Sequence, residues 1–105
     1  MKPASECQTL ADVRVEIDRI DEQIVTLLGM RAAYVHAAAR FKSSEAAVAA
    51  PERLEAMLKT RREWAAREGL SPDFVEKLYR EIVAWFIARE TEEWKNVVSG
   101  KPDRD

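Results

Sequence analysis

Apolar residues recur at alternating spacings of three and four along the first part of the chain, which is the period of an amphipathic α-helix. The positions on this stripe are Leu10, Val13, Ile17, Ile20, Ile24, Leu27, Tyr34, Ala38 and Phe41. No proline interrupts the pattern before Pro51, so we predict a first helix of about 30 residues, roughly 45 Å long. A compact domain of this size has a radius of gyration of about 13 Å. Such a helix therefore extends beyond its own domain, and a second copy of the chain is the simplest cover for its apolar stripe.

A loop and a second helix are expected next. Residues 42–50 have weak periodicity and contain two serines, which favours a loop. Pro51 suits the first turn of a helix, and Gly69 is a good left-handed cap for its end. The apolar side of this second helix is expected to consist of Leu54, Met57, Leu58, Trp64 and Ala65.

A third helix is expected to begin at Ser71-Pro72-Asp73, which has the residue types of an N-cap and a first helical turn. Its apolar residues recur at helical spacing from Phe74 to Val97. Residues 99–105 are expected to form a flexible tail. Together these patterns predict an all-α fold of three helices with a very long first helix, in one domain that covers residues 1–98.

The composition agrees with a helical protein and narrows the function classes. The chain has 105 residues, of which 47% are hydrophobic and 34% charged, with only 3 Gly and 4 Pro. This is too apolar for a disordered chain and too poor in Gly and Pro for a turn-rich β fold. A net charge of -2 gives no bulk electrostatic argument for nucleic acid or an anionic membrane. The single cysteine, Cys7, indicates neither a disulfide scaffold nor a zinc site, and without a signal peptide or a bilayer-spanning apolar run we expect a cytoplasmic protein.

Charged residues interrupt the apolar stripes of the first and third helices. A step of four from Leu27 reaches Arg31, and a step of four from Phe86 reaches Glu90. Burying a guanidinium costs several kcal/mol unless it meets an anion. Arg31 could lie at the edge of its stripe with its stem covering apolar surface, or Arg31 and Glu90 could form a buried ion pair. A third explanation for the two charged residues is that they belong to a binding site.

Two further cations, Arg14 and Lys42, directly follow stripe positions and flank the apolar seam. Arg14 and Arg31 are separated by 17 positions, which is about 25 Å along one helix. They can share a small ligand only if Arg14 comes from a second, antiparallel chain. Lys42 is 11 positions from Arg31, and a loop that folds back would bring its ammonium within reach. With Glu90, the three cations would form a mostly apolar pocket suited to a small dianion such as a dicarboxylate.

Most of the chain resembles a known family. The segments Leu10-Ala11-Asp12-Val13-Arg14, Ile17-Asp18-Arg19-Ile20-Asp21 and Leu27-Leu28-Gly29-Met30-Arg31 resemble the first helix of the all-α (AroQ-type) chorismate mutases. The run from Arg40 to Arg53 is more specific, because it resembles the active-site loop of the isochorismate-pyruvate lyase branch, which makes salicylate for siderophores. The third helix, with Phe74-Val75-Glu76 and residues 82–88, also resembles that branch.

The resemblance implies an intertwined homodimer with two equivalent active sites. In each site, Arg14 of one chain would join Arg31 and Lys42 of the other. The two arginines would hold the substrate carboxylates, and Lys42 would lie over the breaking ether oxygen. The implied reaction is a pericyclic elimination that converts isochorismate to salicylate and pyruvate without a metal or an organic cofactor. Weaker chorismate mutase activity is expected as a side reaction.

Glu90 departs from the lyase pattern, because the lyases have glutamine at this position while some mutases have glutamate. A glutamine amide donates a hydrogen bond at any pH, whereas a carboxyl group donates only when it is protonated. Nearby cations favour the ionised form of Glu90, and desolvation and the substrate carboxylates favour the protonated form. Ionised Glu90 could instead accept from the substrate hydroxyl, so both charge states stay open.

Two other functions fit part of the pattern. A chorismate mutase, with conversion of chorismate to prephenate as its main activity, would use the same architecture. A non-catalytic helical dimerisation module would explain the long amphipathic helix, but not Arg31 and Glu90 within apolar stripes. In such a module, leucine at both positions should stabilise the dimer and preserve its function.

Overall fold

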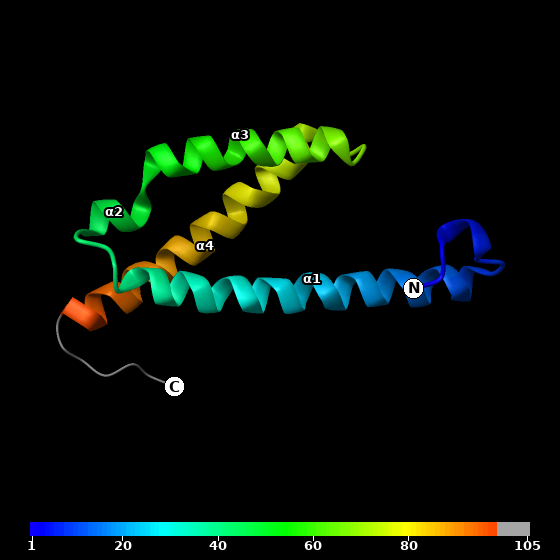
Figure 1. Cartoon of the computed structure of the whole chain (residues 1–105), viewed down its shortest axis with the longest axis horizontal. Coiled ribbons are helices and arrows are strands. Elements are labelled where there is room, and N and C mark those ends of the chain that lie inside the picture. Colours follow the sequence, from blue (N-terminus) through cyan, green and yellow to red (C-terminus); the bar gives the residue numbers. More distant parts are fainter. Residues whose placement is uncertain (99–105) are drawn as a thin grey trace. The chain divides into compact units, whose positions relative to one another are not determined.

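The computed structural model describes residues 1–98, and nearly all of them lie in helices (Figure 1). The elements are the 3-10 turn η1 (Ala4–Glu6) and the α-helices α1 (Leu10–Ala39), α2 (Glu45–Ala49), α3 (Pro51–Arg67) and α4 (Pro72–Val98). The described residues contain no β-strand. The predicted all-α fold with a very long first helix is confirmed, since α1 has 30 residues. The predicted tail, residues 99–105, lies outside the described residues.

Two compact units divide the chain, and the boundary between them falls within α1, after Tyr34. The first unit contains η1 and most of α1. The second unit contains the last turn of α1 together with α2, α3 and α4. The single domain expected over residues 1–98 stays a prediction.

In the first unit, two hydrogen bonds between side chains and the backbone fix the start of α1. Thr9 Oγ1 accepts from the backbone N–H of Asp12 at 3.0 Å, and Asp12 Oδ2 accepts from the backbone N–H of Gln8 at 3.0 Å. The Thr9 bond satisfies a donor that the first turn of a helix leaves unpaired. The Gln8 N–H also holds the pKa of the Asp12 carboxyl below its usual value, because a hydrogen bond to the charged form favours it.

The apolar stripe predicted along α1 is exposed over most of its length in the single chain. Its large side chains between Leu10 and Tyr34 are 38% to 77% exposed. They include Leu10, Val13, Ile17, Ile20, Ile24, Leu27 and Tyr34. A continuous exposed apolar surface of this length is typical of a protein–protein interface.

The core of the second unit forms where α2 and α3 pack against α4. Its buried apolar residues are Ala39, Val48, Met57, Leu58, Ala65, Val75, Val83 and Phe86. Met57, Leu58 and Ala65 confirm the apolar side predicted for the second helix. Trp64 departs from that prediction, since it is 43% exposed. Its ring lies under the guanidinium of Arg61, 4.5 Å from the ring centroid, so a cation rather than the core covers one of its faces.

Two capping motifs make the turn between α3 and α4. Gly69 has φ 75°, and the N–H of the following Leu70 donates to the carbonyl of Ala65 at 2.8 Å, as in a Schellman motif. Ser71 Oγ then accepts from the N–H of Phe74 at 3.2 Å, which caps the start of α4. The predicted end of the second helix and the predicted start of the third are confirmed.

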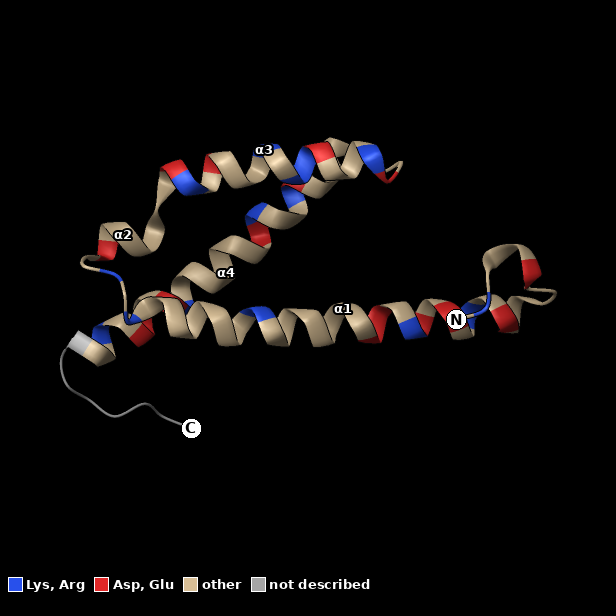
Figure 2. Cartoon of the chain, in the orientation of Figure 1, with Lys and Arg blue, Asp and Glu red and all other residues tan. Residues whose placement is uncertain are grey.

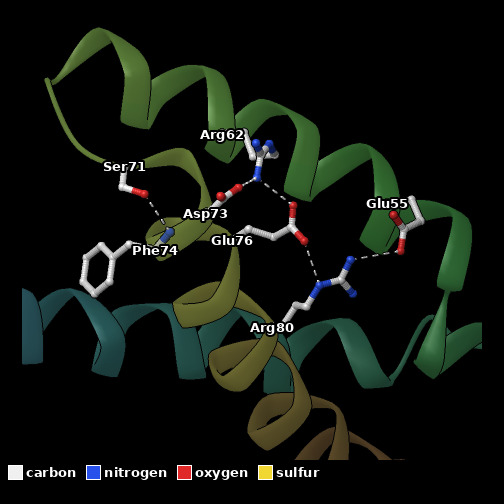
Figure 3. A network of polar contacts seen from close by, with 7 residues as sticks. All are labelled: Glu55, Arg62, Ser71, Asp73, Phe74, Glu76 and Arg80. Atoms are coloured by element: carbon white, nitrogen blue, oxygen red, sulfur yellow. Dashed lines mark hydrogen bonds and ion pairs between the residues drawn. The ribbon is translucent and has the colours of Figure 1, made fainter.

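Ion pairs join α3 and α4 near this turn (Figure 3). Arg62 donates to Asp73 at 2.8 Å and to Glu76 at 3.1 Å, and Arg80 reaches Glu76 at 3.1 Å and Glu55 at 3.7 Å. The carboxylate of Asp73 holds the pKa of Arg62 above its usual value. Because these side chains are largely in contact with solvent, each pair contributes little alone, but together they join the two helices at several points.

The segment expected to be a loop, residues 42–50, contains the short helix α2. Ser44 Oγ accepts from the N–H of Ala47 at 3.0 Å, which caps the first turn, and the alanines that follow favour helix. Val48 is buried at 3% exposure, so a contact with the core holds the turn in place. Sequence periodicity missed this helix because five residues are too few to show a helical period.

Candidate active site

Lys42 lies just after α1, where the backbone leaves the helix. The N–H groups of Phe41 and Lys42 still donate to the carbonyls of Ala38 and Ala39, at 3.0 and 3.3 Å. These i to i−3 bonds tighten the end of the helix. Lys42 is therefore held at the junction of α1 and α2, and its side chain is half-buried, at 28% exposure.

Glu90 is the buried acid of α4. It lies one turn after Phe86 and is 7% exposed, as is Phe86 itself. The prediction of a carboxylate within an apolar stripe is therefore confirmed in the structure. A carboxyl group in such surroundings requires a polar partner, since burial without one is costly.

Lys42 and Glu90 come together from opposite ends of the second unit's sequence. The Nζ of Lys42 lies 3.8 Å from Oε2 of Glu90 and 3.4 Å from the carbonyl oxygen of Ala47. Both distances exceed the 2.7 to 3.2 Å that is usual for strong hydrogen bonds. The ammonium therefore keeps the capacity to form a shorter, charge-assisted bond with an anionic oxygen.

Trp94 adds a contact to Lys42 that sequence reasoning missed. Its indole Nε1 donates to the backbone carbonyl of Lys42 at 2.9 Å. Trp94 lies four residues after Glu90, so one face of α4 contacts Lys42 at both its carbonyl and its ammonium. Helical spacing places Trp94 on the same stripe as Glu90. The hydrogen bond itself joins residues 52 positions apart, so a local sequence pattern cannot predict it.

Arg14 and Arg31 lie on α1 in the first unit. Arg14 is exposed and Arg31 is half-buried. Arg31 is the only Lys, Arg, Asp or Glu between residues 23 and 39, and most of this part of α1 is tan in Figure 2. Because one continuous helix contains both arginines, they are about 25 Å apart along it, and one small ligand cannot bind both within a single chain.

Residues 1–98 offer neither a metal site of clustered ligands nor a membrane-spanning helix. No group of three or more His, Cys, Asp or Glu side chains is placed to hold a metal ion. None of the described helices combines the length and the apolar character needed to cross a membrane.

A protein family matches most of the chain. The family described as chorismate mutase type II matches residues 13–91, a span that includes Arg14, Arg31, Lys42 and Glu90. This chain therefore belongs to the chorismate mutase type II family, an all-α family. The family resemblance inferred from the sequence is confirmed.

Two curated proteins are similar to the chain. An isochorismate pyruvate lyase of Pseudomonas aeruginosa is 52% identical over 95 residues, which is 90% of this chain and 94% of that protein. A T-protein of Haemophilus influenzae is 33% identical over 86 residues, which is 81% of this chain but 23% of that longer protein. The first similarity extends over nearly the full length of both chains.

Proposed function

We propose that this protein is an isochorismate-pyruvate lyase, which converts isochorismate to salicylate and pyruvate, with weaker chorismate mutase activity. The observation that carries this proposal is the 52% identity, over almost the whole of both chains, with the isochorismate pyruvate lyase of Pseudomonas aeruginosa. Membership of the chorismate mutase type II family agrees with it. The two activities use isomeric dicarboxylates, so one pocket suits both substrates.

The reaction requires little covalent chemistry from the protein. The ether C–O bond of isochorismate breaks while the neighbouring ring hydrogen moves to the enolpyruvyl methylene carbon. That carbon becomes the methyl group of pyruvate, the ether oxygen becomes its ketone oxygen, and the ring becomes aromatic. The protein has to hold a reactive conformer and place positive charge where negative charge grows.

Lys42 is suited to the electrostatic part of this task. Its ammonium lies at 3.4 and 3.8 Å from its partners in the described residues, so a growing negative charge on the ether oxygen would draw it into a shorter bond. Arg31 and Arg14 of the partner subunit would bind the two substrate carboxylates. Glu90, buried near the Lys42 ammonium, would contact a substrate oxygen, either as a donor when protonated or as an acceptor from the substrate hydroxyl when ionised.

The site is completed by a second copy of the chain in this proposal. Arg14 and Arg31 cannot meet on one small ligand within one α1, and the exposed apolar stripe of that helix needs a cover. An intertwined homodimer satisfies both requirements, because an antiparallel partner brings Arg14 to Arg31. A cytoplasmic location and a role in siderophore biosynthesis stay predictions.

A chorismate mutase is the second candidate, favoured by the family match over residues 13–91. The deciding experiment mixes the purified protein with isochorismate and records salicylate fluorescence, with chorismate run in parallel and followed by the loss of its absorbance. Rapid salicylate release supports the lyase. Loss of chorismate without salicylate from isochorismate assigns the chain as a mutase. Inactivity of the folded dimer toward both substrates supports a non-catalytic dimerisation module.

A further inference from the structure

Trp94 contacts the backbone of Lys42, the residue to which the proposed function gives the charge-stabilising role. The indole N–H of Trp94 donates to the Lys42 carbonyl at 2.9 Å. The contact lies entirely within the second unit. Trp94 also lies beyond residue 91, where the family match ends.

The position of Lys42 in the chain explains why this bond fixes its backbone. Lys42 follows the end of α1 and precedes α2, so its carbonyl belongs to a short connection outside both helices. A buried or half-buried carbonyl requires a donor, and the donor in the structure comes from α4 rather than from the local chain. The bond therefore fixes the backbone from which the long and flexible lysine side chain extends.

Glu90 and Trp94 act on Lys42 from the same face of α4. They are four residues apart, which is about 6 Å along a helix. Glu90 lies 3.8 Å from the Lys42 ammonium, and Trp94 bonds to its carbonyl. One helix therefore holds the backbone of Lys42 and places a carboxylate near its ammonium.

We infer that Trp94 is a positioning residue for the lyase reaction: its indole N–H fixes the backbone of Lys42, so that the ammonium lies where negative charge develops. This inference rests on the proposed function of Lys42. A positioning role predicts a loss in kcat rather than in substrate binding, because the ammonium acts mainly in the transition state. It also predicts that Trp94 has no effect on catalysis once the ammonium is absent.

The first test is Trp94→Phe, which keeps an apolar ring and removes the N–H. We expect kcat for salicylate formation to fall about tenfold, which corresponds to the full net strength of one ordinary hydrogen bond, with KM within about twofold of the native value. In a Lys42→Ala background the same substitution should cause no further loss, which is the signature of two coupled residues. The control is Trp85→Phe on the same helix, since Trp85 is half exposed, and its kcat should match that of the native protein.

Incorporation of 3-benzothienylalanine at position 94 tests the inference if Trp94→Phe does not fold. That residue keeps the shape of the indole and replaces its N–H with sulfur, so it should give the same loss in kcat. An unchanged kcat in this protein would overturn the inference while leaving the proposed function intact. An equal loss in the native and Lys42→Ala backgrounds would also overturn it, because Trp94 would then act independently of Lys42.

The hydrogen bond can also be observed without turnover. The indole N–H of Trp94 should exchange with solvent more slowly than that of Trp85 in NMR spectra, and it should do so in Lys42→Ala as well, because the acceptor is a backbone carbonyl. Exchange as fast as that of Trp85 would refute the contact. A native protein that makes no salicylate, or a Lys42→Ala variant with native kcat, would instead overturn the function on which the inference rests.

Discussion

Lys42 and Glu90 show how two residues in different surroundings bring their charged groups together. Glu90 is buried because it lies on the apolar side of α4, between Phe86 and Trp94 along the helix. Lys42 reaches it from the junction of α1 and α2, and the two charged groups lie 3.8 Å apart. The pair is too long to be a strong ion pair, which suits a site that has to exchange this contact for one with a substrate.

Lys42→Ala should reduce kcat for salicylate formation by about 100-fold or more, because removing one group that stabilises developing charge commonly costs that much. KM should change much less, since in the proposed site the two arginines bind the substrate carboxylates. Steady-state rates with isochorismate measure both quantities. Lys77→Ala removes an exposed lysine of α4 and should leave both unchanged. A native kcat for Lys42→Ala would remove Lys42 from the mechanism.

Glu90→Gln distinguishes the two roles open to the buried acid. If the protonated form of Glu90 is the active one, turnover of the native protein rises as the pH falls through the Glu90 pKa, because a carboxyl group donates a hydrogen bond only when it is protonated. The glutamine amide donates at any pH, so the variant should show a flat profile over the same range. Circular dichroism at each pH verifies that the protein stays folded. A flat native profile would instead indicate that ionised Glu90 accepts from the substrate hydroxyl.

The junction of α2 and α3 is the element with a strained backbone. Ala50 is the C-cap of α2 and directly precedes Pro51 at the start of α3, and it has φ 39° and ψ 62°. This left-handed conformation costs a residue with a Cβ about 1–2 kcal/mol. The strain is sustained because Val48 anchors α2 in the core on one side and α3 continues on the other.

Ala50→Gly should stabilise the protein by about 0.5–1 kcal/mol, because glycine adopts the left-handed region without the steric cost but loses more entropy on folding. Urea unfolding followed by circular dichroism measures the change. The matched control is Ala46→Gly, inside α2, which should destabilise by about 0.5–1 kcal/mol. A loss of stability in Ala50→Gly as large as in the control would show that position 50 is not strained in solution.

At the scale of the whole molecule, two features of α1 call for a second chain. They are its exposed apolar stripe and the distance between its two arginines. Both are satisfied when two chains combine, and neither is satisfied by one. The proposed homodimer therefore follows from two independent features of α1, its apolar surface and the separation of Arg14 from Arg31.

Mixing two inactive variants tests whether each site draws on two chains. Arg14→Ala and Arg31→Ala, mixed in equal amounts and refolded together, should regain activity, because each mixed dimer keeps one intact site and about a quarter of all sites are then native. The control mixes Arg31→Ala with Lys42→Ala. In the proposed site Arg31 and Lys42 come from the same chain, so no mixed dimer would have an intact site and no activity should return. Equal recovery in both mixtures, or none in the first, would contradict a shared site.

Much of the fold could be predicted from local patterns. The 30 residues of α1, the cap at Gly69 and the start at Ser71 depend on hydrophobic periodicity and on turn chemistry that involves neighbouring residues. The short helix α2 could not be predicted from periodicity, because five residues are too few to show a helical period and because the contact that anchors it, through the buried Val48, is made with the core. The exposure of Trp64 could not be predicted for a related reason. Its ring contacts the guanidinium of Arg61, three residues away, rather than another helix.

The candidate site also has one part that local sequence predicts and another part that depends on distant contacts. Arg31 and Glu90 could be identified from the sequence, because a charge in an apolar stripe breaks a period that neighbouring residues establish. The arrangement of Lys42, Glu90 and Trp94 depended on the tertiary structure, because those contacts join positions about 50 apart. Periodicity describes which face of a helix is apolar, whereas only the packing of α2 and α4 determines which atoms meet across that face.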